Sequence, residues 1–200
     1  METIRGKRCF ELSFNEFRQQ AARYNRIVLD LGTGDGRYVH CLAERNPRWF
    51  VIGVDSCREN LHEHSRAKLP NMLFVIANAQ SLPCELGGLI SHITINFPWG
   101  SLLESLLTRD LSLMCGLESI ARSVTTLEIR LNSDALTEAG TTLERGAETI
   151  CENLNRLGWQ VNTPALMDSH TLSNFPSTWA RRLAHGRDPR AMSMSGYLIR

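Results

Sequence analysis

The 200-residue sequence has no apolar run longer than a few residues, so no segment is long enough to span a membrane. Its first residues lack the apolar core of a signal peptide, and we therefore expect a cytoplasmic protein. Internal repeats, low-complexity stretches and linkers are absent as well. A chain of this length can bury one α/β core. We expect a single domain over residues 1–200, with a hairpin and helix in residues 1–24 and the core in residues 25–200.

The sequence also lacks the patterns of metal sites and disulfide frameworks. Its six cysteines include no C-x-x-C pair, and neither they nor the six histidines are clustered with zinc spacing. We expect reduced structural cysteines and no metal cofactor.

Net charge is nearly absent too, at +1. The positive charge is unevenly placed, however, because the last twenty residues hold five Arg against one acidic residue, Asp188. Such asymmetry can form a local anion-binding patch on a near-neutral protein. A solvated basic tail is the alternative interpretation.

The most informative stretch that is present covers residues 27–38, where an apolar strand pattern leads into Gly32, Gly34 and Gly36 and then into a helical pattern. A strand, a tight glycine turn and a helix N-terminus are typical of nucleotide-like ligand sites in open α/β sheets. A dinucleotide fingerprint would need its third glycine at position 37, which is Arg37. The pattern D-x-G-x-G-x-G from Asp30 instead resembles motif I of S-adenosylmethionine (SAM)-dependent methyltransferases. A plain strand-to-helix turn is the simpler alternative.

A second apolar strand, residues 49–54, ends at Asp55, which follows Gly36 by 19 positions. This offset is close to the roughly 20 residues typical of an acidic side chain that binds a ribose hydroxyl. Asp55 could instead be an N-cap of the next helix.

The remaining pattern alternates strands and helices, which predicts a mostly parallel, doubly wound, Rossmann-like sheet preceded by a short hairpin. The expected strands are residues 27–31, 49–54, 72–76, 90–97, 124–131, 159–161 and 193–199. The expected helices are 14–24 (with Ser13 and Glu16 at capping-box spacing), 37–46, 58–69, 102–107, 111–121 and 143–157, and residues 132–134 are expected to form a turn.

Two tryptophans lie outside these predicted core strands. Trp99 follows Pro98 at the end of the strand 90–97, and Trp179 is followed directly by basic residues. Two aromatic faces can enclose a nucleobase that has left its stack, and arginines can neutralise the phosphates around it. Core packing is the alternative for each Trp.

Three segments together resemble one family. They are Leu29-Asp30-Leu31-Gly32-Thr33-Gly34-Asp35-Gly36-Arg37, Phe97-Pro98-Trp99-Gly100-Ser101-Leu102-Leu103 and Ser177-Thr178-Trp179-Ala180-Arg181-Arg182-Leu183-Ala184-His185-Gly186-Arg187. They resemble the aminoglycoside-resistance 16S rRNA (adenine 1408-N1)-methyltransferases, and the similarity extends over residues 6–196. This resemblance implies a class I methyltransferase fold that takes SAM as cofactor and the decoding region of the 30S subunit as partner. We expect a monomer with no membrane partner.

The resemblance also implies three sets of site residues. The expected catalytic residues are Trp99, Trp179 and Ser177. The expected cofactor-binding residues are Asp30, Gly32, Gly34, Gly36, Tyr38, Asp55, Asn78, Ala79, Gln80, Asn96, Phe97, Pro98 and Ser101. The expected RNA-binding residues are Lys7, Arg66, Lys68, Arg181, Arg182, Arg187 and Arg190.

The chain departs from the family pattern at three places. A long Lys-rich loop before the strand 72–76 is reduced here to Arg66 and Lys68. The acidic residue that the family has after this strand is replaced by Gln80, and the segment between residues 131 and 142 is short.

Adenine N1 has a free lone pair and no proton, so its methylation needs no general base, which is consistent with the lack of an obvious acid–base pair. Two other functions remain open at this point: a SAM-dependent methyltransferase acting on tRNA or a small molecule, and a non-catalytic RNA-binding module on a methyltransferase fold. The intact Asp30, glycine turn and Asp55 argue against the module.

Overall fold

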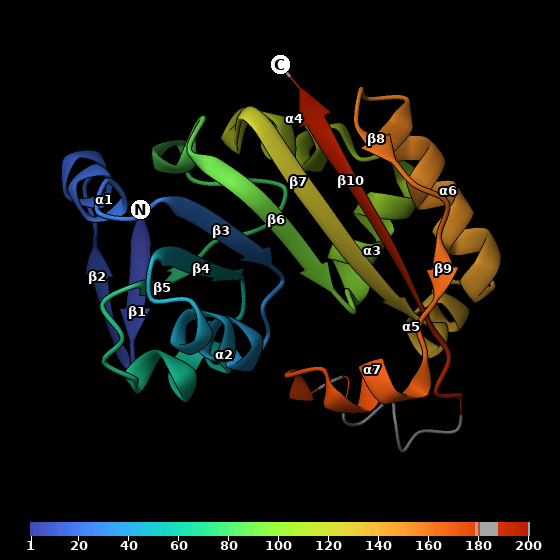
Figure 1. Cartoon of the computed structure of the whole chain (residues 1–200), viewed down its shortest axis with the longest axis horizontal. Helices are drawn as coiled ribbons and strands as arrows, with labels where there is room; N and C mark the ends of the chain where they lie inside the picture. Colours follow the sequence, from blue (N-terminus) through green and yellow to red (C-terminus); the bar gives the residue numbers. More distant parts are fainter. Residues whose placement is uncertain (179, 181–187, 200) are drawn as a thin grey trace.

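The computed structural model describes residues 1–178, 180 and 188–199, and these residues form one ten-stranded sheet (Figure 1). Its five central strands are parallel, in the order β5-β4-β3-β6-β7. They are β3 (Arg26–Leu31), β4 (Trp49–Asp55), β5 (Met72–Ile76), β6 (Ile90–Asn96) and β7 (Ala121–Asn132). The strand order reverses at β3 and β6, which is the usual position of a ligand site in such sheets. The predicted mostly parallel α/β fold is confirmed.

Antiparallel strands complete both edges of the sheet. The hairpin of β1 (Glu2–Arg5) and β2 (Arg8–Glu11) joins the sheet next to β5, as the predicted short hairpin. On the other edge β10 (Ala191–Ile199) pairs with β7, with β8 (Gln160–Val161) and with β9 (Ala165–Leu166). The hairpin and the core therefore share one continuous sheet.

Helices cover the two faces of the sheet unequally (Figure 1). One face carries the larger hydrophobic core, to which α1 (Phe14–Ala21), α3 (Gly100–Thr108), α4 (Leu111–Ile120), α5 (Ser133–Glu138) and α6 (Leu143–Asn155) contribute. The opposite face carries a smaller core built around α2 (Arg37–Arg45), while α7 (Ser169–Asn174) contributes to a third small cluster. This arrangement leaves the carboxyl ends of β3, β4 and β6 free to form a site.

The helix expected at residues 14–24 is present but shorter. Ser13 accepts a hydrogen bond from the Glu16 backbone N–H, and the Glu16 carboxylate accepts one from the Ser13 backbone N–H, so the predicted capping box is confirmed. The helix ends at Ala21. Beyond it, the Tyr24 hydroxyl donates to the Pro70 carbonyl and the Tyr24 ring stacks on Phe50.

The helix expected at residues 58–69 is wrong. The segment forms two short 3-10 turns, η1 (Asn60–His62) and η2 (His64–Arg66). Leu61 is its one fully buried apolar side chain, which is too little for the apolar stripe of an amphipathic helix. Buried Ser65 instead accepts a hydrogen bond of 2.8 Å from the Gly6 N–H, so a polar contact fixes the segment to the hairpin.

The expected turn at residues 132–134 is also wrong, because Asn132 is the N-cap of the short helix α5. The small strand β9 and the helix α7 were not expected from the sequence. Asp168 caps α7 by accepting a hydrogen bond from the Thr171 N–H at 2.8 Å, a contact that the polar sequence around it did not reveal.

No helix within residues 1–178, 180 and 188–199 is both long and apolar enough to cross a bilayer. The thiols of all six cysteines are free. In the part of the chain that the structure describes, no three His, Cys, Asp or Glu side chains converge as a metal ion would require.

Candidate active site

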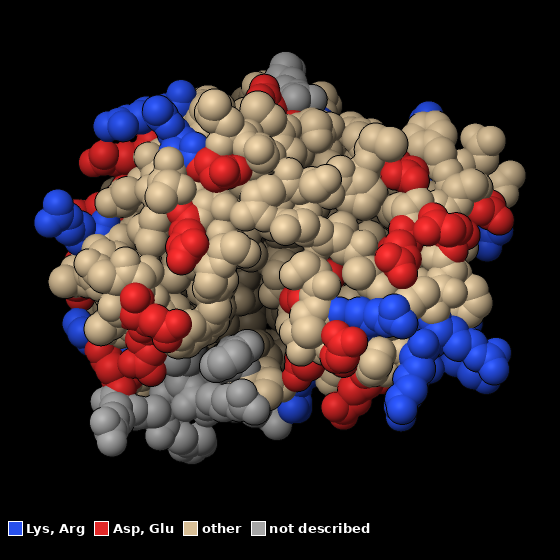
Figure 2. Space-filling view, turned by 180° about the vertical axis from the view of Figure 1, so that it is seen from behind, with Lys and Arg blue, Asp and Glu red and all other residues tan. Residues whose placement is uncertain are grey.

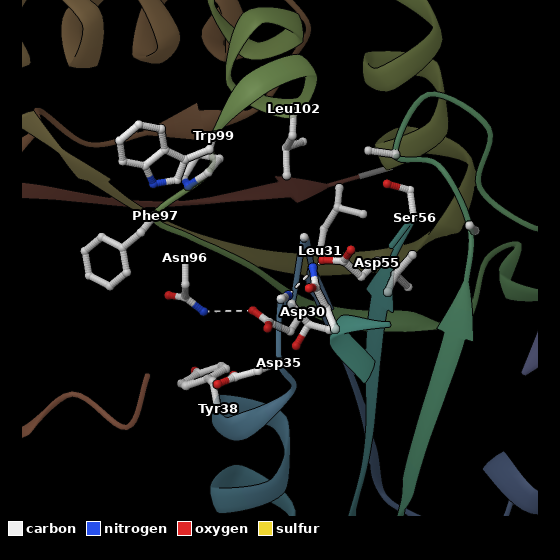
Figure 3. A pocket seen from close by; sticks show the side chains of 18 of the residues that line it. Asp30, Leu31, Asp35, Tyr38, Asp55, Ser56, Asn96, Phe97, Trp99 and Leu102 are labelled. Atoms are coloured by element: carbon white, nitrogen blue, oxygen red, sulfur yellow. Dashed lines mark hydrogen bonds between the residues drawn. The ribbon is translucent and has the colours of Figure 1, made fainter. Parts of the chain in front are cut away.

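A cavity of about 270 Å³ lies at the carboxyl ends of β3, β4 and β6 (Figure 3). Its walls come from the glycine turn after β3, the end of β4, the segment after β5, the turn between β6 and α3, and Ser177. These segments are far apart in sequence, and the parallel strands bring their ends to one edge of the sheet.

The glycine turn needs its glycines for different reasons. All three have positive φ angles, of 71° at Gly32, 59° at Gly34 and 79° at Gly36. A Cβ atom at Gly32 would lie 2.6 Å from the Leu102 side chain, and one at Gly36 would lie 2.4 Å from the Phe74 ring. Gly34 has open space instead, and it lines the cavity. Gly36 therefore packs the turn against β5, while Gly34 leaves room for a ligand.

Asp55 presents a half-buried carboxylate at the end of β4. Its Oδ2 accepts a 2.8 Å hydrogen bond from the Gly34 N–H, and its Oδ1 accepts one of 2.8 Å from the Cys57 N–H. Burial raises the pKa of Asp55, while these two backbone donors lower it. Each oxygen keeps a further lone pair, so the carboxylate can still accept hydrogen bonds from the two hydroxyls of a ribose.

Asp30 is the buried acidic group beneath the cavity. Its Oδ1 accepts hydrogen bonds from Thr94 Oγ1 at 2.7 Å and from Asn96 Nδ2 at 2.8 Å (Figure 3). Burial raises the pKa of Asp30 to about 6, although the hydrogen bonds from Thr94 and Asn96 and the charge of Arg130 lower it. A buried carboxylate with this pKa is ionised at pH 7 and is stabilised by any cation that enters the cavity.

The turn after β6 is strained. Phe97 has a φ angle of 53°, which is costly for a bulky residue, and its N–H donates to the Arg130 carbonyl at 2.7 Å. Pro98 follows, and Trp99 then occupies the N-cap position of α3. Asn96, Phe97 and Trp99 are thereby placed together along one wall (Figure 3).

A second set of aromatic contacts holds the segment that carries Ser177. The Phe175 ring stacks on Tyr38 with 5.1 Å between the ring centroids, and its centroid lies 5.6 Å from that of Phe97 in an edge-on arrangement. Directly after Ser177, Thr178 Oγ1 donates to Asp35 Oδ2 at 2.5 Å. The glycine turn and the chain 143 positions later therefore meet at the cavity.

Most of the predicted cofactor-binding residues line this one cavity, as do Trp99 and Ser177. These cofactor candidates are Asp30, Gly32, Gly34, Tyr38, Asp55, Asn78, Ala79, Asn96, Phe97, Pro98 and Ser101.

Two predicted cofactor-binding residues lie elsewhere. Gly36 packs against Phe74, as described above. Gln80 is directed away from the lining, and its Nε2 donates to Ser105 Oγ in α3 at 2.7 Å. A side chain at this position that bonds α3 contributes to packing between the loop and the helix.

Sequence reasoning missed several lining residues. Thr33 and Asp35 alternate with the glycines of the same motif, while Ser56 follows Asp55 directly and Asn60 lies five positions after it. Their position next to predicted residues was the available signal, and the expected helix at residues 58–69 obscured it.

The predicted RNA-binding residues separate into three groups. Lys7, Arg66 and Lys68 are exposed, and the Gly6–Ser65 hydrogen bond brings the hairpin turn of Lys7 next to the turn of Arg66. Arg190 lies apart from them, and its guanidinium is hydrogen bonded to Asp188 at 2.8 Å and to Glu144 at 3.0 Å. Trp179, Arg181, Arg182 and Arg187 lie outside the described residues.

Charge alone does not mark a binding face on the side of the molecule shown in Figure 2. Lys and Arg side chains gather at its margins and are mixed with Asp and Glu. A docking surface for RNA must therefore be argued from particular side chains.

Comparisons with known proteins agree with the site. The model of the family described as NpmA, 16S rRNA (adenine(1408)-N(1))-methyltransferase, matches residues 2–198. A protein of that name from Escherichia coli is 32% identical over 99% of this chain and 99% of its own length. A second, from Streptoalloteichus hindustanus, is 30% identical over 94% of each chain. The crystal structure of the 16S rRNA methyltransferase KamB superposes with a TM-score of 0.89 at 28% identity and covers all of both chains.

A match of this extent, on a sheet whose switch point carries Asp30, Asp55 and the glycine turn in one cavity, shows that the chain belongs to the 16S rRNA (adenine(1408)-N(1))-methyltransferase family.

Proposed function

We propose that this protein transfers the methyl group of SAM to N1 of adenine 1408 in the 16S rRNA of the 30S subunit, and that it acts on ribosomal subunits in the cytoplasm. The observation that carries the proposal is the cavity itself. It joins two acidic side chains, suited to a nucleoside with a cationic substituent, to Trp99 and Ser177 on its rim.

The residues of the cavity fit SAM. Asp55 has hydrogen-bonding capacity left for ribose hydroxyls. Asp30 is a buried carboxylate that a cationic ligand would stabilise. The apolar Leu102 and Val54 also line the cavity and can pack against the flat face of an adenine. SAM, when bound, supplies a methyl group activated by the positive charge of its sulfonium sulfur.

The protein contributes position rather than proton transfer. Adenine N1 attacks with a lone pair that is already free, so no side chain has to act as a base. A stacked indole at Trp99 can hold a flipped adenine flat and favours the positive charge that develops on the methylated base. Correct placement of two reactants can lower an activation barrier by several kcal/mol. The rate of methylation therefore depends on how rigidly Trp99, Ser177 and Trp179 orient the base.

Docking to the ribosomal subunit is proposed to use the exposed basic side chains of two adjoining segments. Lys7 and Arg66 are brought together by the hairpin, and Lys68 follows in the same short loop. Contacts of Lys and Arg with phosphates fix the register of an RNA-binding protein without reading sequence. We propose that these three residues, with Arg181, Arg182 and Arg187, contact the rRNA, and that one copy of the chain acts as a monomer.

The proposed product explains drug resistance. Methylation at N1 gives adenine 1408 a positive charge and an added methyl group within the decoding site. Both changes disfavour the binding of cationic aminoglycosides, through repulsion and through steric overlap.

The direct test is incubation of the protein and SAM with purified 30S subunits, followed by primer extension across the decoding region. A new stop at adenine 1408 is expected. A stop at another nucleotide, or methylation of free tRNA or a small molecule with none on 30S subunits, would replace the proposed acceptor. Failure to bind SAM by calorimetry would favour a non-catalytic RNA-binding module.

Trp99→Ala and Trp179→Ala should each abolish methylation and leave SAM affinity nearly unchanged, because each indole is proposed to hold the acceptor base. Trp49→Ala is the matched control. Trp49 begins β4 and stacks under the Arg26 guanidinium at 4.5 Å, outside the cavity. Loss of SAM binding in both variants would assign the two indoles to structural packing.

A further inference from the structure

The side chain of Arg130 on β7 contacts two parts of the site: the proposed SAM pocket, or donor half, and the segment that carries Ser177, or acceptor half. It has no role in the function proposed so far. Its Nη1 donates to Asn96 Oδ1 at 2.8 Å, and its Nη2 donates to Glu128 Oε2 at 2.6 Å. Its guanidinium carbon lies 4.7 Å from the centroid of the Phe175 ring. The side chain is 18% exposed, so these contacts are made in a largely dry environment.

The hydrogen bond to Asn96 connects Arg130 to the donor half of the site. Asn96 accepts from Arg130 through Oδ1 and donates through Nδ2 to Asp30, the buried carboxylate beneath the cavity. The amide of Asn96 is therefore oriented by Arg130 on one side and by Asp30 on the other, while Thr94 holds Asp30 independently. The main chain adds to this, because the Arg130 carbonyl accepts the N–H of strained Phe97.

The contact with the Phe175 ring connects Arg130 to the acceptor half of the site. Phe175 precedes Ser177 and Thr178 by two and three positions, and the three groups stacked on or beside its ring are Arg130, Tyr38 and Phe97. A guanidinium over an aromatic face is attracted by the ring quadrupole, and more strongly when water is excluded. Arg130 thus contacts both Asn96 and Phe175.

We propose that Arg130 is a positioning residue that couples occupancy of the donor pocket to the placement of the segment carrying Ser177. The proposal rests on the proposed function for its catalytic consequence. A ligand charge next to Asp30 changes the hydrogen bonding of Asp30 and Asn96. The guanidinium of Arg130 then shifts with Asn96, and the Phe175 ring shifts with the guanidinium on which it stacks. Lysine cannot replace it, since an ammonium has neither the planar fork for Asn96 and Glu128 nor a flat face for the ring.

The test compares the full-length wild type with Arg130→Lys, Phe175→Leu and the double variant. Arg122→Met is the matched control, because Arg122 is an exposed arginine at the other end of the same strand. For each protein we would measure thermal stability, SAM affinity by calorimetry, and kcat and KM for 30S subunits.

Arg130→Lys should lower kcat about 10- to 100-fold, as expected when reacting groups are misplaced by about 1 Å, with SAM affinity changed less than about threefold. Phe175→Leu should give a similar loss, and the double variant should be little worse than either, because both break one connection. A kcat near the wild-type value, a loss that follows SAM affinity or KM, or losses that multiply would each overturn the proposal.

Amide hydrogen exchange at Phe175, Ser177 and Thr178, with and without SAM, measures the coupling independently of methylation. SAM should slow exchange in the wild type and in Arg122→Met, and should no longer do so in Arg130→Lys although SAM still binds. Equal protection in Arg130→Lys, or none in the wild type, would overturn the coupling. Protection that depends on Arg130 in a wild type that gives no stop at adenine 1408 would support the coupling and refute only the proposed acceptor.

Discussion

Lowering the pH from 7 to 5 should weaken SAM binding about tenfold, because Asp30 titrates within this range. Burial raises the pKa of Asp30 to about 6, so its carboxyl is mostly ionised at pH 7 and mostly protonated at pH 5. The proposed role of Asp30 is to face the cationic part of SAM, and only the ionised form can do so.

The magnitude follows from the fraction of ionised Asp30. If only that form binds, the apparent dissociation constant grows by a factor of about 11 at pH 5 and about 1.1 at pH 7, a ratio of about ten or 1.4 kcal/mol. The amino group of SAM adds little, because an α-amino group with a pKa of about 8 stays protonated throughout. Burial raises the pKa of Asp55 as well.

The free protein should respond in the opposite direction. The pKa of Asp30 is higher in the folded protein than in the unfolded chain, so the folded state binds more protons between about pH 4 and pH 6. From this group alone, the free energy of unfolding falls as pH rises through that range, by up to about 3 kcal/mol. SAM should therefore raise the melting temperature more at pH 7 than at pH 5.

Calorimetric titrations at pH 5, 6 and 7 with wild type and Asp30→Asn test this account. The variant is nearly isosteric and should bind SAM weakly, without the tenfold change in affinity that Asp30 contributes across this range. A wild-type affinity that does not change, or an equal change in Asp30→Asn, would refute the assignment to Asp30. S-adenosylhomocysteine, which lacks the sulfonium charge, separates the contributions of the two cationic groups: an unchanged pH dependence assigns Asp30 to the amino group.

Three further changes have defined outcomes. Burial lowers the pKa of His92 to about 4, so as pH falls the unfolded chain takes up a proton at this residue before the folded protein does, and the folded protein loses stability. His92→Gln should remove this loss, which is up to about 3 kcal/mol between about pH 6.5 and pH 4, as measured by urea unfolding at each pH. Gly36→Ala places a Cβ atom 2.4 Å from the Phe74 ring at a φ of 79° and should lower the melting temperature more than Gly34→Ala, which meets no neighbour and should mainly weaken SAM binding. Ser13→Ala removes the cap of α1 and should cost about 1 kcal/mol in urea unfolding without changing SAM affinity.

The parallel core of the fold could be predicted because its signal is local. Strands such as Arg26–Leu31 and Trp49–Asp55 are nearly continuous apolar runs, as expected for strands covered on both faces. The helix predicted at residues 58–69 was wrong because the segment is fixed in part by a contact between Gly6 and Ser65, 59 positions apart. Hydrophobic periodicity reports which side chains avoid water, and it does not report a buried serine held by a distant backbone N–H.

The candidate site divides in the same way. Asp30, Asp55 and the glycine turn could be predicted, since each lies at a fixed offset from the end of a strand and the sheet brings those ends together. Gln80 was assigned to the pocket by its position after β5, but the direction of its side chain depends on Ser105 in α3. Position along a strand predicts where a residue lies in the fold, while its hydrogen-bond partner determines the direction of a flexible side chain.

The two halves of the site differ in what specifies them, and this explains why Arg130 escaped sequence reasoning. The donor pocket is built from short motifs that are each read within about ten residues. The acceptor side needs the turn at Phe97 and the segment at Phe175 to meet, and no local pattern records that contact. Arg130 occupies an inner strand position where an apolar residue is the usual choice, between the buried residues Ile129 and Leu131. An arginine there is retained in a dry environment only if its hydrogen bonds and ring contact are satisfied together, which ties the geometry of Asn96 to that of Phe175.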